Sequence, residues 1–278
     1  MLEITKSGQS CGASVRGVNL CAPLNDDEVS SIRKAWLEHH VLAFPDQPMT
    51  DDDLERFSQY FGPFGYDPFI APIEGRDHVI AVKRAADETA PLFAENWHTD
   101  WSFQENPPIG TCLHSRIVPS NGGDTLYSNQ HAALAAMPVE MRAKYEGLQA
   151  IHSAVQAYSN EGAYGDADEG RSMDIRPSKE AEERQTHALI RAQPDTGEMG
   201  LFGCFGYIIG FEGMENEESL PLLMELYQWQ DREEFQYRHK WEKDMLVMWD
   251  NRSVLHKATG GYEGQERLLH RTTVGAIV

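Results

Sequence analysis

The stretch ENWHTDW, residues 95–101, places a histidine and an aspartate two positions apart between two tryptophans. Its apolar, aromatic character is typical of a strand, and in a strand the side chains of residues i and i+2 point to the same face. We therefore expect His98 and Asp100 to lie side by side. An imidazole and a carboxylate are suitable ligands for divalent iron, which proteins often hold with two histidines and one carboxylate on one face of an octahedron.

The second histidine of such a site is best supplied by His256. The stretch VMWDNRSVLHKA, residues 247–258, carries this histidine out of a buried apolar strand that ends in a polar turn. The spacing of His98 and Asp100 alone also fits a histidine that is hydrogen-bonded within the core, so the metal site depends on what the rest of the chain offers.

Two arginines on the last expected strand point to bound anions. In RLLHRTTV, residues 267–274, a period of two places Arg267, Leu269 and Arg271 on one face. A buried arginine is costly unless it meets an anion, and the guanidinium fork suits a carboxylate, sulfonate or phosphate. A solvated edge strand with surface arginines is the alternative.

Short strands with glycine and proline turns and a few separate helices predict a mainly β fold of the α+β class, a sandwich or barrel with helical decoration. No internal repeat or linker divides the chain, so residues 1–278 are expected to form a single domain. Helices are expected at 24–40, 49–62, 134–148 and 220–235, and strands at 41–47, 78–84, 110–118, 244–258 and 266–278. The polar, glycine-rich stretch 160–185 has little to bury and predicts a mobile loop or lid.

The composition favours small-molecule chemistry. With 24 basic and 44 acidic residues the formal net charge is -20, which argues against binding to nucleic acid or to an anionic membrane surface. The N-terminus lacks the apolar core of a signal sequence, and no run approaches the length of a membrane span, so a cytoplasmic protein is expected. The four cysteines are scattered and expected to be reduced thiols. A homo-oligomer, dimer or tetramer, is compatible with the sequence.

Taken together, these stretches resemble the taurine and 2,4-dichlorophenoxyacetate dioxygenase family of Fe(II)/2-oxoglutarate-dependent oxygenases. The similarity runs nearly end to end and rests on the motifs GASVRGVNLCAPL, HHVLAFPDQPMT, FSQYFGPFG, NWHTDWSF, PPIGTCLHSRIVPSNGGDTLYSN, VMWDNRSVLH and RLLHRTTV. The resemblance implies a double-stranded β-helix, a jelly roll related to the cupins. It further implies Fe(II), 2-oxoglutarate and O2 as cofactor and co-substrates, and hydroxylation of a small organic substrate with release of succinate and CO2.

The resemblance also assigns roles to individual residues. His98, Asp100 and His256 match the iron ligands of the family. Thr125, in the motif GGDT, and Arg267 match the residues that hold the distal carboxylate of 2-oxoglutarate.

Four further residues are expected at the substrate. Arg271 matches the position that in several members binds the anionic group of the substrate, and with Arg267 occupied by 2-oxoglutarate it is expected to be free for that task. Where members that oxidise taurine carry a histidine, this chain reads FGPFGYDPF, residues 61–69, which places Tyr66 and Asp67 there. A carboxylate at this place opposes a sulfonate, which argues against taurine itself. We expect a small substrate with a carboxylate, sulfate or sulfonate, in a pocket that includes Tyr207.

Two other functions fit part of the sequence. A non-catalytic cupin-like protein could bind or sense metal and 2-oxoglutarate without turnover. A zinc hydrolase could use the same two histidines and aspartate with an open coordination position, but it leaves Arg267 unexplained.

Overall fold

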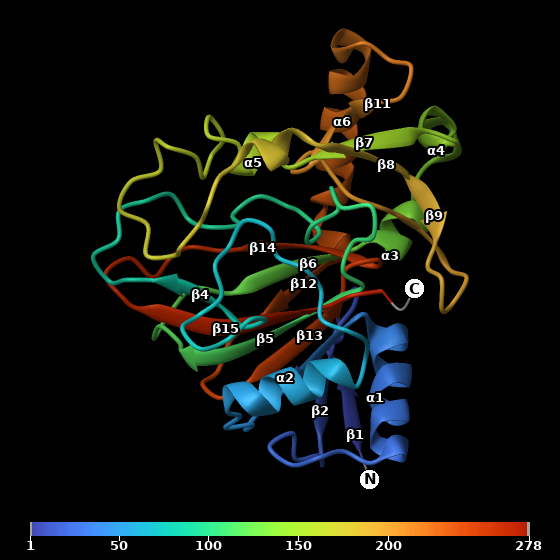
Figure 1. Ribbon diagram of the computed structural model, residues 1–278. Coiled ribbons are helices and arrows are strands. Elements are labelled where there is room, and N and C mark those ends of the chain that lie inside the picture. The colour runs from blue at the N-terminus through green and yellow to red at the C-terminus, as the bar shows by residue number, and fades with distance from the viewer. Residues whose placement is uncertain (1, 277–278) are drawn as a thin grey trace.

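Two β-sheets face one another in the computed structural model of the chain, which describes residues 2–276 (Figure 1). The larger sheet has seven strands in the order β1 (Glu3–Lys6), β2 (Ala13–Arg16), β3 (Val41–Phe44), β13 (Leu246–Asp250), β5 (Gly110–Ile117), β15 (Arg267–Val274) and β4 (Ile80–Arg84). The facing sheet has three strands in the order β12 (Gln236–His239), β6 (Thr125–Asn129) and β14 (Val254–Ala258). The structure is thus mixed α/β and mostly sheet, as the sequence predicts.

The central strand β13 shows how the two faces of the large sheet are used. Leu246 and Met248 pack into a core formed with the N-terminal helices, whereas Val247 and Trp249 pack between the two sheets. This alternation follows from the period of two along a strand. The strand predicted at 244–258 is two strands in the structure, β13 and β14, which are joined by a tight turn.

Helices α1 (Asp26–His39) and α2 (Asp51–Gln59) cover the outer face of the large sheet (Figure 1). Each begins with a capping box, in which the side chain of Asn25 or Thr50 accepts from the backbone three residues later. Both helices lie where the sequence predicts them. The strand expected at 41–47 ends at Phe44, because Pro45 follows and Asp46 has a positive φ of 59°.

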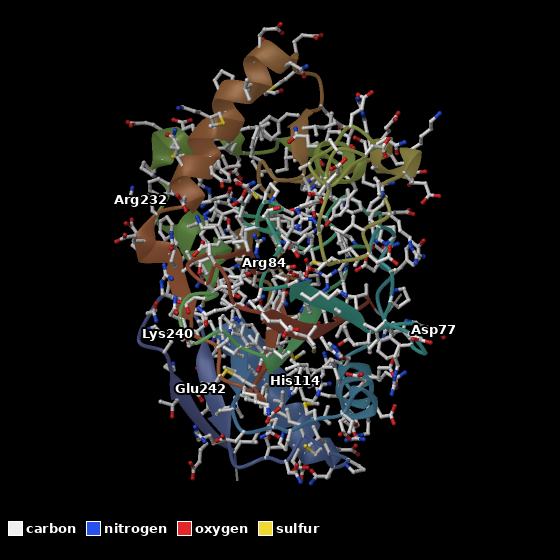
Figure 2. The ribbon with its side chains drawn as sticks, turned by 90° about the vertical axis from the view of Figure 1, so that its left-hand side faces the viewer. Asp77, Arg84, His114, Arg232, Lys240 and Glu242 are labelled. Carbon is white, nitrogen blue, oxygen red and sulfur yellow. The ribbon has the colours of Figure 1, made fainter. Side chains whose placement is uncertain are left out.

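A second layer of structure lies on the other side of the small sheet, around a separate apolar core. Its helices are α3 (Gln130–Ala135), α4 (Val139–Tyr145), the single-turn α5 (Val155–Tyr158) and α6 (Asn216–Gln230), with the 3-10 turns η1 (Lys179–Glu182) and η2 (Glu233–Phe235). Its strands form a three-stranded sheet in the order β11 (Ile208–Phe211), β7 (Gln149–Ser153) and β8 (Arg184–Ala188), and a two-stranded sheet of β9 (Ile190–Ala192) and β10 (Met199–Leu201). Figure 2, turned by 90°, shows α6 projecting from this layer, with Arg232 close to its end.

Two predicted helices have different bounds in the structure. The helix expected at 134–148 is interrupted, because Pro138 stands between α3 and α4 and cannot continue the first helix. The helix expected at 220–235 begins earlier, at Asn216, where Glu215 and Glu218 form a capping box. The strand expected at 266–278 ends at Val274, and its last two expected residues, 277–278, lie outside the described part of the chain.

The stretch 95–101 is not a strand, which corrects the sequence prediction. Only His98 makes a β-bridge, to His256, through backbone hydrogen bonds of 3.1 and 2.8 Å in the two directions. The chain turns directly afterwards, and Trp101 has a positive φ of 49°. Thr99 helps to hold the turn by donating from Oγ1 to the carbonyl of Asn251 at 2.7 Å.

The stretch 160–185 buries more than its composition indicates, and its role as a mobile loop or lid stays a prediction. Met173 and Ala181 are in the core, and the ion-paired side chains of Asp168 and Arg171 are 5% and 4% exposed. The described helices include none with the length and apolarity needed to cross a bilayer. All four cysteines are free thiols, as predicted.

Candidate functional site

Three buried side chains converge where the small sheet meets the turn after residue 95. His98 Nε2 lies 3.8 Å from Asp100 Oδ1, and His256 Nε2 lies 3.7 Å from the same oxygen. The two imidazole rings are 4.2 Å apart between centroids. The β-bridge between His98 and His256 sets this pairing, because it aligns strand β14 with the start of the turn that carries Asp100. The predicted ligand set is thus brought together by one bridge and one turn.

The protonation of this cluster suits a cation. His98 Nδ1 lies 2.9 Å from the carbonyl of Asn96, which can only accept, so Nδ1 carries the hydrogen and Nε2 has a free lone pair. Burial lowers the pKa of His98 and lowers that of His256 to about 3, so both rings are neutral near pH 7. Burial acts to raise the pKa of Asp100, but His256, Arg271 and His98 outweigh it and hold that pKa below its usual value.

These residues fit a divalent metal ion. One ligand atom from each of His98, Asp100 and His256 lies within 4.8 Å of the others, and Nδ1 of His256 makes no hydrogen bond within residues 2–276 that would prevent Nε2 from carrying the lone pair. Asp100 is 1% exposed, and its other oxygen, Oδ2, accepts from Thr111 Oγ1 at 2.6 Å. A buried carboxylate beside two lone pairs is unfavourable by itself and becomes favourable around a cation.

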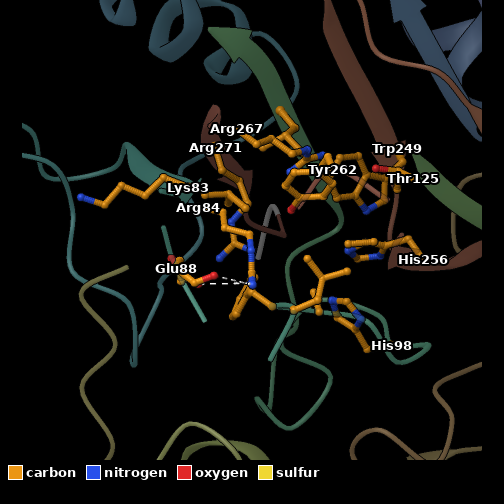
Figure 3. A pocket seen from close by; sticks show the side chains of 16 residues that line it. Lys83, Arg84, Glu88, His98, Thr125, Trp249, His256, Tyr262, Arg267 and Arg271 are labelled. Carbon is orange, nitrogen blue, oxygen red and sulfur yellow. Dashed lines mark hydrogen bonds and ion pairs between the residues drawn. The ribbon is translucent and has the colours of Figure 1, made fainter. Parts of the chain in front are cut away.

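A cavity beside this cluster contains the residues predicted for 2-oxoglutarate. Figure 3 shows Arg267 and Arg271 entering it from one side and His98 and His256 from the other. Arg267 is 6% exposed, and its guanidinium makes neither an ion pair nor a hydrogen bond within residues 2–276. Thr125 Oγ1 accepts from Trp241 Nε1 at 3.0 Å, which leaves the threonine hydroxyl hydrogen available to donate. A buried arginine without a carboxylate, next to a free hydroxyl donor, is a suitable site for an anion.

Arg271, unlike Arg267, is paired with a carboxylate of the protein, which corrects the expectation that it has no partner until the substrate binds. Its Nη2 lies 2.6 Å from Asp67 Oδ2, and its Nη1 lies 3.6 Å from Asp100 Oδ1. Burial alone lowers the pKa of Arg271, but Asp100 and Asp67 outweigh burial and raise it above its usual value, so Arg271 stays charged. Burial raises the pKa of Asp67, and the contact with Arg271 opposes that rise.

The other two residues predicted at the substrate are separated by the fold. Tyr207 lines a second cavity of about 390 Å³ that adjoins the first through Phe93, Ala94 and His98. Its ring lies 6.2 Å from that of His98. The side chain of Tyr66 is instead 69% exposed and lines an outer pocket with Asp67. Tyr66 is therefore not at the metal side of the site.

The second cavity is predominantly aromatic. Its walls include Trp97, Tyr158, Tyr164, Phe205, Tyr207 and Tyr227. Phe69, Trp101 and Phe103 pack in the same buried cluster as Tyr158 and Tyr207. A cavity of this size and lining suits a ring or a short aliphatic chain.

Sequence reasoning missed Thr111 and Trp241. Thr111 holds the free oxygen of Asp100, and Trp241 orients the hydroxyl of Thr125. Thr111 lies in the motif PPIGTCLHSRIV, but nothing in its spacing indicates a partner 11 residues earlier in the chain.

Comparisons with known proteins agree with this geometry. The model of the family described as "Taurine catabolism dioxygenase TauD, TfdA family" matches residues 3–273. An alpha-ketoglutarate-dependent sulfate ester dioxygenase of Pseudomonas putida is 30% identical over 100% of this chain and 90% of its own length. An alpha-ketoglutarate-dependent 2,4-dichlorophenoxyacetate dioxygenase of Cupriavidus pinatubonensis is 31% identical over 94% of this chain and 93% of its own.

A solved structure supports the same relation. A taurine dioxygenase from Burkholderia xenovorans superposes with a TM-score of 0.81 and 28% identity, covering 100% of this chain and 90% of the other. The chain therefore belongs to the taurine catabolism dioxygenase TauD, TfdA family and is an Fe(II)- and 2-oxoglutarate-dependent dioxygenase.

Proposed function

We propose that the chain hydroxylates a small organic substrate that carries a carboxylate, sulfate or sulfonate. We also propose that its two facing sheets form a double-stranded β-helix. In this proposal His98, Asp100 and His256 bind Fe(II), and Thr125 and Arg267 bind the distal carboxylate of 2-oxoglutarate. The observation that carries it is the unpaired, buried guanidinium of Arg267 in the same cavity as two of the three ligand residues. A zinc hydrolase has no use for such a group.

The substrate class rests on the relatives and on the cavities. The names of the two relatives describe action on sulfate esters and on 2,4-dichlorophenoxyacetate, which are both anions, and the solved structure is named for taurine. The aromatic cavity beside His98 offers space for the apolar part of such a molecule. Cytoplasmic location and assembly as a dimer or tetramer stay predictions from the sequence.

The roles of the chain follow from its own groups. When bound, Fe(II) and 2-oxoglutarate supply oxidising power from O2, with release of succinate and CO2. Arg267 and Thr125 orient 2-oxoglutarate by charge and by a hydroxyl donor. The aromatic walls around Tyr207 exclude water and hold the substrate against His98.

The test is succinate formation from 2-oxoglutarate by the purified protein, with Fe(II), O2 and a panel of phenoxy acids, alkyl sulfates and sulfonates. A substrate that raises the rate above the background, with one succinate per product, supports turnover. Binding of metal and 2-oxoglutarate without succinate indicates the sensing protein instead. Zinc-dependent activity without O2 indicates the hydrolase.

The residue roles have their own test in Arg267→Ala. We expect the half-saturating concentration of 2-oxoglutarate to rise strongly, because a buried charged pair that loses one partner costs roughly 2 to 5 kcal/mol. Arg76→Ala, which removes an arginine paired with Asp52 and Glu55 at the surface, is the matched control. Unchanged half-saturation in Arg267→Ala contradicts the assignment.

A further inference from the structure

Two arginines on one strand line the same cavity, but only one of them has a carboxylate partner. Arg267 has no carboxylate partner within residues 2–276, whereas Arg271 is paired with Asp67 at 2.6 Å. Both side chains are buried, at 6% and 5% exposed. A substrate anion that approaches Arg271 therefore meets a guanidinium that already has a counter-ion.

The pair between Asp67 and Arg271 is held firmly from both ends. Asp67 Oδ1 accepts from the backbone N–H of Ile70 at 3.1 Å, which fixes the carboxylate while Oδ2 faces Arg271. The loop before it is tied to strand β15, since Gly65 N donates to the carbonyl of Thr273 at 2.9 Å. The guanidinium carbon of Arg271 lies 5.1 Å from the ring centroid of Trp101. An anion at Arg271 can still accept from its Nε, which has no partner among the described residues, but it meets a guanidinium whose charge Asp67 already offsets.

The balance of charge leads to the same result. Arg267 and Arg271 are balanced by Asp67 and Asp100, and a divalent metal is balanced by the dianion of 2-oxoglutarate. The loaded site is thus neutral, and one more anion leaves an uncompensated negative charge in a buried cavity. The other charged residues that line this cavity do not change the balance, because Arg84 is paired with Glu88 and Lys83 is exposed.

Resting on the proposed function, we propose that Asp67 is a specificity-determining residue that competes with the anionic group of the substrate for Arg271. Arg271 lines the inner cavity with His98 and His256, and it also lines the outer pocket with Asp67 and Asp77. Asp67 holds Arg271 from the outer side and weakens its attraction for anions on the inner side. Neutral molecules of the same shape then bind at least as well as the anion.

The test compares Asp67→Asn with Asp77→Asn, using phenoxyacetate and its uncharged amide, phenoxyacetamide, as probes. Binding is measured by calorimetry on protein loaded with Fe(II) and 2-oxoglutarate in the absence of O2. Asp67→Asn has the size of aspartate and keeps an oxygen for Ile70 N, but it lacks the charge. Asp77 is exposed in the same outer pocket and has no contact with Arg271, so it is the matched control (Figure 2).

We expect Asp67→Asn to lower the Kd of phenoxyacetate about tenfold, the scale of a hydrogen bond to a charged group, and to leave that of phenoxyacetamide within about twofold. Asp77→Asn leaves both values as in the wild type. An Asp67→Asn variant that binds phenoxyacetate no better than the wild type, or that gains equally for the two probes, overturns the proposal. An Asp67→Asn variant that does not bind phenoxyacetate at all also overturns the proposal.

A wild-type measurement covers the case in which Asp67→Asn does not fold. The wild type is expected to bind phenoxyacetate no more tightly than phenoxyacetamide, because the anion adds an uncompensated charge to a loaded site that is neutral. A wild type whose Kd for phenoxyacetate is tenfold or more below its Kd for phenoxyacetamide contradicts the proposal. Failure of the proposed function is recognised separately, because the wild type then forms no succinate and its affinity for probes does not depend on 2-oxoglutarate.

Discussion

The two oxygens of Asp100 have separate tasks. Oδ1 faces His98 Nε2 and His256 Nε2, and Oδ2 accepts from Thr111 Oγ1 at 2.6 Å. The threonine hydroxyl therefore fixes which oxygen is presented to a metal and in which direction. Asn251 Nδ2 donates to Thr111 Oγ1 at 2.9 Å and leaves that hydroxyl with its hydrogen directed at Asp100.

Removal of the Thr111 hydroxyl should weaken metal binding. Thr111→Val keeps the shape of the side chain but frees the Asp100 carboxylate to rotate, and loss of such a partner of a metal ligand costs about 10- to 100-fold in affinity. The measurement is a competitive titration of Fe(II) against a chelator, with thermal unfolding to confirm the fold. Thr272→Val is the control, because its buried hydroxyl is bonded to Ser58 Oγ. Equal Fe(II) affinity in Thr111→Val and wild type rules out the orienting role.

Single residues were predictable from sequence where their chemistry is local or repeated in motifs. His98 and Asp100 are two positions apart, and His256 and Arg267 lie in recognisable stretches. The pairing of Asp67 with Arg271 spans 204 residues and depends on how the loop before Ile70 is tied to β15, which no local pattern contains. The state of Arg271 could therefore be known only from the structure.

Among the elements, the turn at 95–101 shows how a correct site can follow from an incorrect secondary structure. The aromatic residues of this stretch are typical of a strand, but Trp97 and Trp101 are fully buried because the turn is enclosed, not because it is part of a sheet. One β-bridge at His98 replaces the predicted strand. Tertiary packing overrode local propensity here, as it does in short apolar segments.

The segment 160–185 is the element whose behaviour should depend most on ligands. Tyr164 lines the aromatic cavity, and its hydroxyl accepts from Ala94 N at 3.0 Å, so the segment is attached to the wall of the site. Residues 166–170 are mostly exposed. We expect limited proteolysis to cut within 160–171 first in the ligand-free protein, and expect Fe(II), 2-oxoglutarate and substrate together to slow that cut.

Two comparisons sharpen the proteolysis experiment. Tyr164→Phe loses the bond to Ala94 and should be cut faster. The exposed turn 194–198 lines neither cavity with His98, so cleavage there should be independent of ligands. Equal cleavage of 160–171 with and without ligands identifies a passive loop and not a lid.

Across the whole molecule, burial sets the protonation of histidines outside the metal cluster as well as within it. Burial lowers the pKa of His40 and of His114 to about 4 in each case. His114 is fully buried in β5, where its Nε2–H donates to the carbonyl of Gln47 at 2.7 Å (Figure 2). The folded protein must keep these rings neutral, whereas the unfolded chain can protonate them near the ordinary value of 6.5.

The sign of the resulting pH dependence follows from proton binding. Below about pH 6.5 the unfolded chain takes up protons that the folded protein does not, so the free energy of unfolding falls as the pH falls towards 4. At pH 5 each of these histidines lowers the free energy of unfolding by roughly 2 kcal/mol relative to pH 7.

Urea unfolding of the metal-free protein at pH 7 and pH 5 measures this loss of stability. His114→Gln keeps a donor for Gln47 but cannot be protonated, so its loss between the two pH values should be smaller than that of the wild type by about 2 kcal/mol. His78→Gln, at an exposed ring, is the control. A His114→Gln variant that loses as much stability as the wild type between pH 7 and pH 5 means that the buried imidazole does not limit stability in acid.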